Sequence, residues 1–204
     1  DPMIDPAGAG SGSEVSARGG SWSHNSSITR LANRIHNDPN LRRRTVGLRL
    51  ARTIGQDTSG DDDDDDDAIA CGASGVAYVA PGQGINLRNI CGGTFEMGCT
   101  AALQSDGNCE ADESPAHNVT LTQDFWLADT EVTQGQWQTL MGTNPSFFGP
   151  NGGGSDCVGL DCPVEEVNWY EAMAFANALS ASEALAECYT LSNCTGALGD
   201  GCGS

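Results

Sequence analysis

The chain has 204 residues, enough for one good-sized domain or two small ones, and it carries a formal net charge of −19. This charge excludes nucleic acid as the main partner, because binding to phosphates needs clustered cations. No apolar stretch approaches the roughly 18 residues of a membrane span, and the 27 glycines predict a loop-rich backbone with a modest core.

Residues 1–54 carry most of the positive charge. All nine basic residues are arginines, and eight of them precede residue 55. The same segment contains four acidic residues. Residues 46–52 (VGLRLAR) alternate apolar residues with arginine, which is the pattern of a half-buried strand. Residues 18–22 (RGGSW) place two glycines before a tryptophan, as at a tight turn that enters a core. We expect loops and short strands in this segment.

Residues 55–84 form the expected linker. Its centre, residues 61–67, is an unbroken run of seven aspartates, which repel one another and do not pack. Calcium-binding loops alternate their ligands and bend at glycine so that oxygens converge, and a uniform run lacks that spacing. We therefore interpret the run as a solvated spacer.

Residues 85–204 are expected to form a second folding unit, which begins with short strands. Residues 93–98 (GTFEMG) have the composition of a strand between glycines. Residues 119–122 (VTLT) alternate apolar and hydroxyl side chains and lead into the apolar residues 125–127 (FWL). This alternation predicts another half-buried strand.

Two helix starts follow in the second unit. Thr133 and Gln136 have capping-box spacing, and the helix that they open should end at Gly142. Asn168 and Glu171 repeat this arrangement, with Asn as the cap and Glu three residues on. In the second helix the positions i, i+3, i+4 and i+7 predict one apolar face, formed by Ala172, Phe175, Ala176 and Leu179.

All nine cysteines lie between Cys71 and Cys202, and no two form a CxxC motif, so the spacing does not support zinc ribbons or thioredoxin-like sites. Cysteine at this density beside glycine-rich loops favours disulfides and an oxidising compartment. We therefore expect an exported protein, in the periplasm, at the cell surface or outside the cell. An odd count leaves one cysteine without a partner in this chain. The candidate pairs are Cys99 with Cys109, Cys157 with Cys162, and Cys188 with Cys194.

The N-terminal residues 1–10 (DPMIDPAGAG) lack the basic and apolar regions of a signal peptide. The cysteine content is typical of exported, disulfide-bonded proteins, yet no export signal is visible. The simplest explanation is that the chain begins in the middle of a larger protein. We therefore expect an exported protein whose signal peptide is not in this chain.

The second unit resembles the opening of a formylglycine-generating-enzyme domain, also called the sulfatase-modifying factor domain. Five motifs in the order of that family carry the resemblance, which makes it far more specific than a single short pattern. They are residues 93–98 (GTFEMG), 112–121 (DESPAHNVTL), 125–127 (FWL), 131–137 (EVTQGQW) and 163–172 (PVEEVNWYEA).

Residues 1–54 are similar to the C-terminal end of the same family's domain. Residues 18–22 (RGGSW), 30–34 (RLANR) and 47–52 (GLRLAR) follow the order of its closing motifs. The tail of one copy thus precedes the head of another, either as tandem copies cut at both ends or as a permuted order. The family's middle section, with its RLPTEAEWE stretch and calcium loops, has no counterpart in this sequence.

The resemblance implies an incomplete α+β fold, the irregular and loop-rich C-type-lectin-like fold of this family. In that fold the first and last strands approach each other. We therefore expect residues 46–52 to pair with the strand near Phe95, since the linker is long enough to close the loop. The implied domains are residues 1–54 as the C-terminal segment of one copy, 55–84 as an acidic linker, and 85–204 as the N-terminal part of a second copy.

Active members of this family hold two cysteines a few residues past the Gly-Gly-Ser-aromatic motif. These bind copper(I), which soft thiolates suit, and oxygen then converts a sulfatase cysteine into formylglycine. The matching residues 23–29 (SHNSSIT) contain no cysteine, and none precedes Cys71. We therefore assign no catalytic, cofactor or metal residue to this chain. Copper and calcium are implied only for complete, active members.

Other side chains with possible chemistry have plainer interpretations. His24 lies two residues after Trp22 without a second ligand at helix or strand spacing, so we expect a surface residue, and we interpret His36 and His117 in the same way. Aromatic residues at the motif positions would line a ligand groove or, more often in proteins, form core. They are Trp126, Trp137, Phe147, Phe148, Trp169 and Tyr170.

These observations predict a non-catalytic, exported binding or surface module of bacterial origin, with an unidentified protein or glycan as its ligand. The first alternative is part of an active copper-dependent oxidase whose parent protein holds a complete copy elsewhere. The second alternative is a gene-model fragment without independent function. A thiolate pair shortly after a Gly-Gly-Ser-Trp motif elsewhere in the parent would favour the enzyme.

Overall fold

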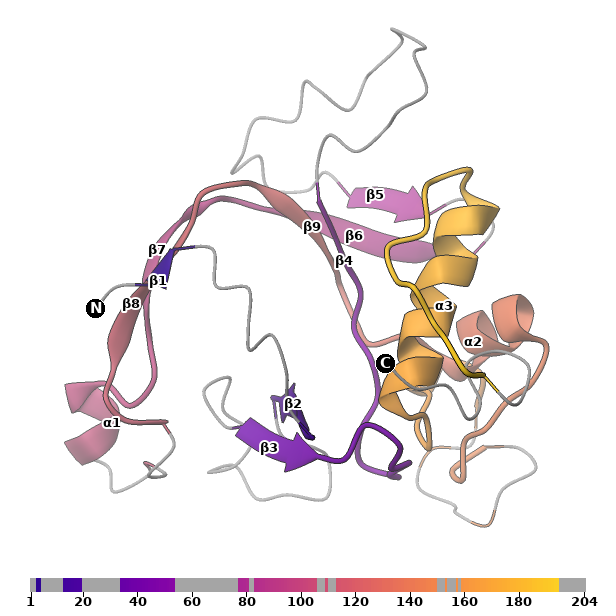
Figure 1. The fold of residues 1–204 in the computed structure, drawn as a ribbon, viewed down its shortest axis with the longest axis horizontal. Helices are drawn as coiled ribbons and strands as arrows, with labels where there is room; N and C mark the ends of the chain where they lie inside the picture. The colour runs from indigo at the N-terminus through magenta and orange to yellow at the C-terminus, as the bar shows by residue number, and fades with distance from the viewer. Residues whose placement is uncertain are drawn as a thin grey trace, which may run out of the picture. The chain divides into compact units, whose positions relative to one another are not determined.

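A computed structural model describes residues 3–4, 13–19, 34–53, 77–80, 83–105, 109, 113–149, 153, 157 and 159–194. The chain divides into two compact units that interleave along the sequence (Figure 1). Unit 1 comprises Asp1–Pro39 and Gly92–Gln123, and unit 2 comprises Asn40–Cys91 and Asp124–Ser204. Each unit therefore combines residues from before and after the expected linker.

Unit 1 contains a three-stranded sheet with the strand order β1-β8-β7. Strands β7 (Gly93–Met97) and β8 (His117–Leu121) are antiparallel, with Phe95 opposite Val119. Strand β1 (Met3–Ile4) lies parallel to β8 on its other side. The two strands that the sequence predicted in this region are thus confirmed.

A separate antiparallel pair in unit 1 joins β2 (Val15–Arg18) to β3 (Arg34–Asn37), and a short helix, α1 (Ala101–Ser105), follows β7. Gly98 ends β7 with a φ of 110°, a conformation that residues with side chains rarely adopt. A Cβ atom at this position would lie 2.6 Å from the backbone oxygen of Glu113. The turn after β7 therefore requires glycine.

Unit 2 is built on a four-stranded antiparallel sheet with the strand order β4-β9-β6-β5. Strand β5 lies within the range 55–84 that the sequence analysis assigns to the linker, whereas the aspartate run lies outside the described residues. The strands are β4 (Ala51–Thr53), β9 (Phe125–Ala128), β6 (Ile85–Ile90) and β5 (Ala77–Ala80).

Two helices of unit 2, α2 (Gln134–Met141) and α3 (Trp169–Ser182), pack against this sheet (Figure 1). Trp137 of α2 stacks on Phe175 of α3, with ring centroids 5.1 Å apart. Each large apolar side chain in this core stabilises the fold by about 1.5–3 kcal/mol. The other core residues are Ile85, Leu87, Trp126, Ala128, Val132, Met141, Val164 and Val167.

Both helix starts that the sequence predicted are confirmed. The hydroxyl of Thr133 accepts a hydrogen bond from the N–H of Gln136 at 3.2 Å, and the Gln136 side chain accepts one from the N–H of Thr133 at 2.9 Å. Asn168 and Glu171 form the second capping box in the same way. Helix α2 ends at Gly142, whose φ of 76° is left-handed, as the sequence predicted.

The core-facing side of α3 differs in part from the prediction. Phe175 is fully buried, as expected, but Ala172 and Ala176 are only half-buried. The alanines that pack against the core are instead Ala174 and Ala178.

No helix in the described ranges combines the length and the apolar character that crossing a membrane requires.

The strand expected at residues 46–52 pairs differently from the prediction. Its regular part is β4, in which Arg52 lies opposite Trp126 of β9. The predicted pairing with the strand near Phe95 was wrong, because that strand is β7 and bonds to β8. The N-terminal segment therefore pairs with a later strand of the head than the family resemblance led us to expect.

The residues before β4 explain this choice of partner. The carbonyl oxygens of Leu48 and Leu50 accept hydrogen bonds from the N–H groups of Val132 and Ala128, both at 2.9 Å. Both leucine side chains pack against the core of unit 2. Burial of these side chains and satisfied backbone groups thus both favour the edge of β9.

Candidate ligand-binding hollow

The histidines that the sequence analysis considered do not form a site in the described residues. His24 and the rest of residues 23–29 lie outside those residues. His36 is exposed on β3, and His117 is half-buried with its Nδ1 atom 3.1 Å from the carbonyl oxygen of Pro115. His117 thus contacts its own turn, which is a structural role.

Half of the aromatic residues that could line a groove belong to the core. Phe147 is half-buried, and the guanidinium of Arg44 lies 3.4 Å from its ring centroid. Trp169 is exposed, with 45% of its surface accessible. The interpretation as core is confirmed for three of the set, namely Trp126, Trp137 and Tyr170.

Two of the three candidate disulfides are formed, and the third is not. Cys188 is free and exposed, whereas Cys194 is bonded to another cysteine, so the predicted Cys188–Cys194 pair is wrong. Spacing alone suggested that pair, but the backbone of Tyr189 is bonded to α3, which fixes the course of the chain beside Cys188. The pairs present are Cys99 with Cys109 and Cys157 with Cys162.

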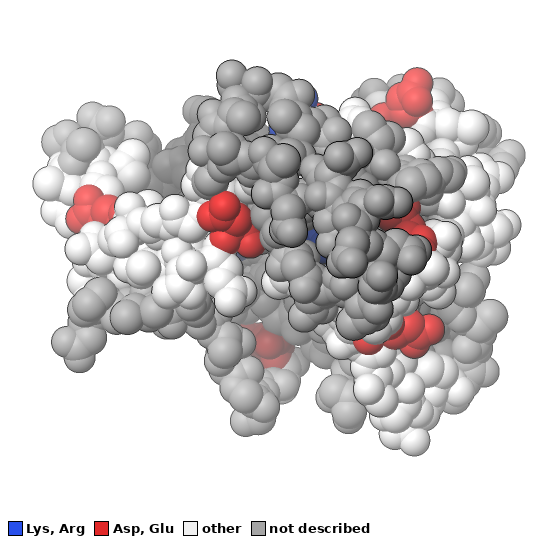
Figure 2. Space-filling view, turned by 90° about the horizontal axis from the view of Figure 1, so that it is seen from above, with Lys and Arg blue, Asp and Glu red and all other residues white. Residues whose placement is uncertain are grey.

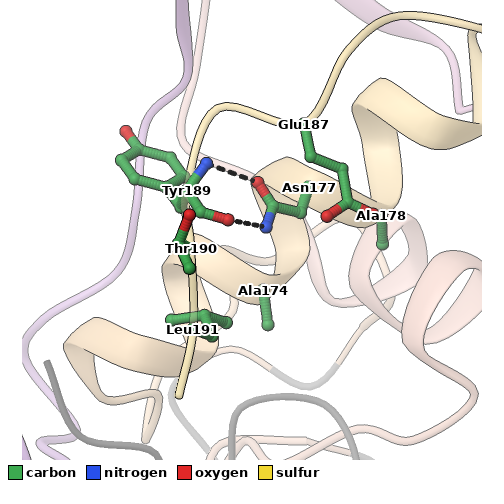
Figure 3. Close-up of a pocket in the computed structure, with 7 residues that line it drawn as sticks. All are labelled: Ala174, Asn177, Ala178, Glu187, Tyr189, Thr190 and Leu191. Atoms are coloured by element: carbon green, nitrogen blue, oxygen red, sulfur yellow. Dashed lines mark hydrogen bonds between the residues drawn. The ribbon is translucent and has the colours of Figure 1, made fainter.

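An open hollow of about 450 Å³ lies between α3 and residues 187–191 in unit 2 (Figure 3). Its volume falls within the roughly 300–1,000 Å³ of ligand clefts in proteins. No sequence pattern indicates this hollow, because residues 187–191 meet α3 only in the folded chain. The hollow is lined by Ala174, Asn177 and Ala178 of α3, and by Glu187, Tyr189, Thr190 and Leu191.

Asn177 holds the two walls of this hollow together. Its Nδ2 atom donates to the carbonyl oxygen of Tyr189 at 2.7 Å, and its Oδ1 atom accepts from the N–H of Tyr189 at 3.0 Å (Figure 3). The Asn177 side chain is buried, so these two bonds satisfy polar atoms that water hardly reaches. These two bonds tie residue 189 to α3.

The inner surface combines a small apolar floor with one carboxylate. Ala174 and Ala178 present methyl groups from α3, and Leu191 adds a larger apolar side chain. Figure 3 shows the Glu187 carboxylate directed toward Ala178, whereas the ring of Tyr189 points away from the helix. Helix α3 has no basic residue in its last turn, so this end of the helix is anionic.

A second polar cluster in unit 2 surrounds the buried carboxyl group of Glu165. Its Oε1 atom accepts the N–H of Phe148 at 2.9 Å, and its Oε2 atom has no partner among the described residues. The hydroxyl of Ser146 accepts the N–H of Glu165 at 3.2 Å. Burial raises the pKa of Glu165, and the nearby charge of Glu166 adds to this shift. The cluster ties Ser146 and Phe148 to Glu165, which precedes α3 in the chain.

The described residues do not fit the copper site of the resembled family. That site needs two thiolates, and within the described ranges Cys188 is the single free thiol. In the same part of the chain, no three His, Cys, Asp or Glu side chains converge as a metal-binding group.

The family model of the sulfatase-modifying factor enzyme 1-like domain matches residues 85–193, just over half of the chain. The fold described above is irregular and α+β, as this family implies. The chain belongs to the family of sulfatase-modifying factor enzyme 1-like domains. The match covers the expected head segment, and the assignment of residues 1–54 to a tail segment stays a prediction.

Two similar proteins match this chain over only part of their own length. A chaperone protein, LppX, of Paenibacillus barcinonensis is 45% identical over 74 residues, which are 36% of this chain and 23% of LppX. The structure of Treponema denticola variable protein 1 shares 32% identity and a TM-score of 0.42, covering 57% of this chain and 38% of that chain. This chain thus spans less than two fifths of the length of either protein.

Proposed function

We propose that this chain is a non-catalytic, exported binding module of the sulfatase-modifying factor type. One observation carries the proposal. Where active members of the family place two copper-binding cysteines, residues 23–29 of this chain offer hydroxyl, imidazole and amide groups. These groups do not reproduce the soft thiolate pair that copper(I) favours.

The disulfides support the exported part of this proposal. Cys99–Cys109 and Cys157–Cys162 both staple short loops, and such bonds persist mainly in oxidising compartments. Cysteines locked in this way serve stability and are withdrawn from metal binding. The module would act in the periplasm, at the cell surface or outside the cell.

The hollow beside α3 supports the binding part. Its walls are held at a fixed separation by Asn177, so the free protein already has the shape that a ligand would meet. A preformed site binds more tightly because little ordering free energy is lost on binding. The ligand class is a protein or a glycan.

An oxidation assay tests the proposal. The purified protein is incubated with copper(I), dioxygen, a reductant that supplies the two further electrons, and a cysteine-containing sulfatase peptide, and the peptide mass is followed by mass spectrometry. We expect the cysteine to remain unconverted. Formation of formylglycine in the peptide, by wild type and by a Cys188→Ser variant alike, would overturn the proposal and favour the copper-dependent oxidase.

A further inference from the structure

We propose that the hollow beside α3 receives a lysine or arginine side chain of a protein partner. This inference rests on the proposed binding function and names the chemistry that its site would recognise. It places a basic side chain in contact with Glu187, and it makes residues 187–191 the recognition segment of this module.

The shape and polarity of the hollow fit such a side chain. Ala174 and Ala178 leave space above α3, and Leu191 extends the apolar surface. Lysine and arginine lay an apolar stem along such a surface and keep their charged head at its rim. The Glu187 carboxylate, which points toward Ala178 in Figure 3, lies where that head would end.

The local charge favours a cation. Glu187 is exposed, and Glu183 caps the C-terminal end of α3, where the helix dipole is also negative. Two arginines of unit 2 are engaged elsewhere, Arg42 with Glu171 and Arg88 with Asp129. On the face shown in Figure 2, acidic residues form several separate patches among the described residues and little arginine surface is visible.

The same hollow suits a sugar less well. Sugar recognition relies on several free hydrogen-bonding groups and on an aromatic face. Both polar atoms of the Asn177 side chain already bond to Tyr189, and the Tyr189 ring points away from α3 (Figure 3). The Glu187 carboxylate and the apolar surface of the hollow therefore suit a single basic side chain better than a glycan.

A matched pair of peptides tests this inference. The probes are a blocked Gly-Gly-Arg-Gly-Gly peptide and its neutral isostere with citrulline, each added to the ¹⁵N-labelled chain. We expect the arginine peptide alone to shift the amide signals of residues 174–178 and 187–191. Glu187→Gln should weaken its binding about fivefold, the size of one partly exposed ion pair. Glu131→Gln, an exposed control in the same unit, should leave binding unchanged.

Each other outcome would overturn the inference. Equal shifts from both peptides would remove the role of charge, and equal losses in the two glutamate variants would show a general charge effect. No shift with either peptide, or shifts of these amides by a neutral oligosaccharide, would also overturn it. A glycan result would leave the proposed binding function standing, whereas formylglycine formation in the oxidation assay would remove that function itself.

Discussion

The carboxylate of Glu171 accepts hydrogen bonds from Arg42, a residue that lies 129 positions earlier in the chain. The Nε atom of Arg42 lies 3.0 Å from Oε2, and its Nη2 atom bonds to Oε1. The same Oε2 atom accepts the N–H of Asn168 at 2.8 Å and so completes the cap of α3. One side chain therefore starts a helix and ties the N-terminal part of unit 2 to it.

Removing the side chain of Glu171 should destabilise unit 2 more than removing that of Arg42. Glu171→Ala removes both the cap and the ion pair, and we expect a loss of about 2–3 kcal/mol in the free energy of unfolding. Arg42→Ala should cost about 1 kcal/mol, because its side chain is 42% exposed. Urea unfolding followed by tryptophan fluorescence measures both values.

Arg88→Ala is the control for this comparison. Arg88 pairs with Asp129 and is 49% exposed, so we expect a smaller loss than for Arg42. Equal losses for the two arginine variants would show that the bond between Arg42 and the helix cap has no special role.

Gly98 should tolerate alanine poorly, whereas Gly93 should accept it. Gly98→Ala combines a left-handed backbone with a close approach to Glu113, and we expect a loss of more than about 2 kcal/mol. Gly93 has open space around it, so Gly93→Ala should change stability by less than about 0.5 kcal/mol. Hydrogen exchange of the β7–β8 amides distinguishes the two variants. Similar protection in both would contradict the strained turn.

Glu165 should stabilise unit 2 at low pH, where its carboxyl group is protonated. Burial raises the pKa of Glu165, so the folded state binds this proton more tightly than the unfolded state does. Its contribution to stability is present below the unfolded pKa and is lost as pH rises through the folded pKa.

Glu165→Gln removes this titration. The unfolding free energy of wild type minus that of the variant should therefore fall as pH rises through the raised pKa of Glu165, as urea unfolding at several pH values would show. A difference that grows with pH would mean that the carboxylate form of Glu165 is the stabilising one.

The local parts of this fold were predictable from sequence. Thr133, Gln136, Asn168 and Glu171 act within one helical turn, so their spacing alone predicts the caps. Gly142 likewise ends α2, because few other residues adopt its left-handed backbone. The alternating residues 119–122 likewise lie largely in strand β8, as their pattern predicts.

The non-local parts were not predictable. The pairing of β4 with β9 depends on Leu48 and Leu50 finding the core of unit 2, which no short pattern encodes. Cysteine spacing did not fix connectivity, and so Cys188 was paired wrongly. The hollow depends on the contact between Asn177 and Tyr189, which only the folded chain brings together.

Cys188 should be the reactive thiol among the described cysteines. It is free and exposed, whereas the cysteines of the Cys99–Cys109 and Cys157–Cys162 pairs have no thiol to react. Alkylation without reduction, followed by peptide mass spectrometry, should label Cys188 and neither of these pairs. Labelling of Cys157 or Cys162 in the folded protein would contradict the disulfide.

Copper(I) binding distinguishes a non-catalytic binding module from a copper-dependent oxidase. A competition titration against a copper(I) chelator compares wild type with Cys188→Ser. We expect weak uptake by wild type through the exposed thiol of Cys188, and loss of this uptake in the variant. Tight stoichiometric uptake that survives Cys188→Ser would reveal a copper site elsewhere in the chain and would contradict a non-catalytic binding module.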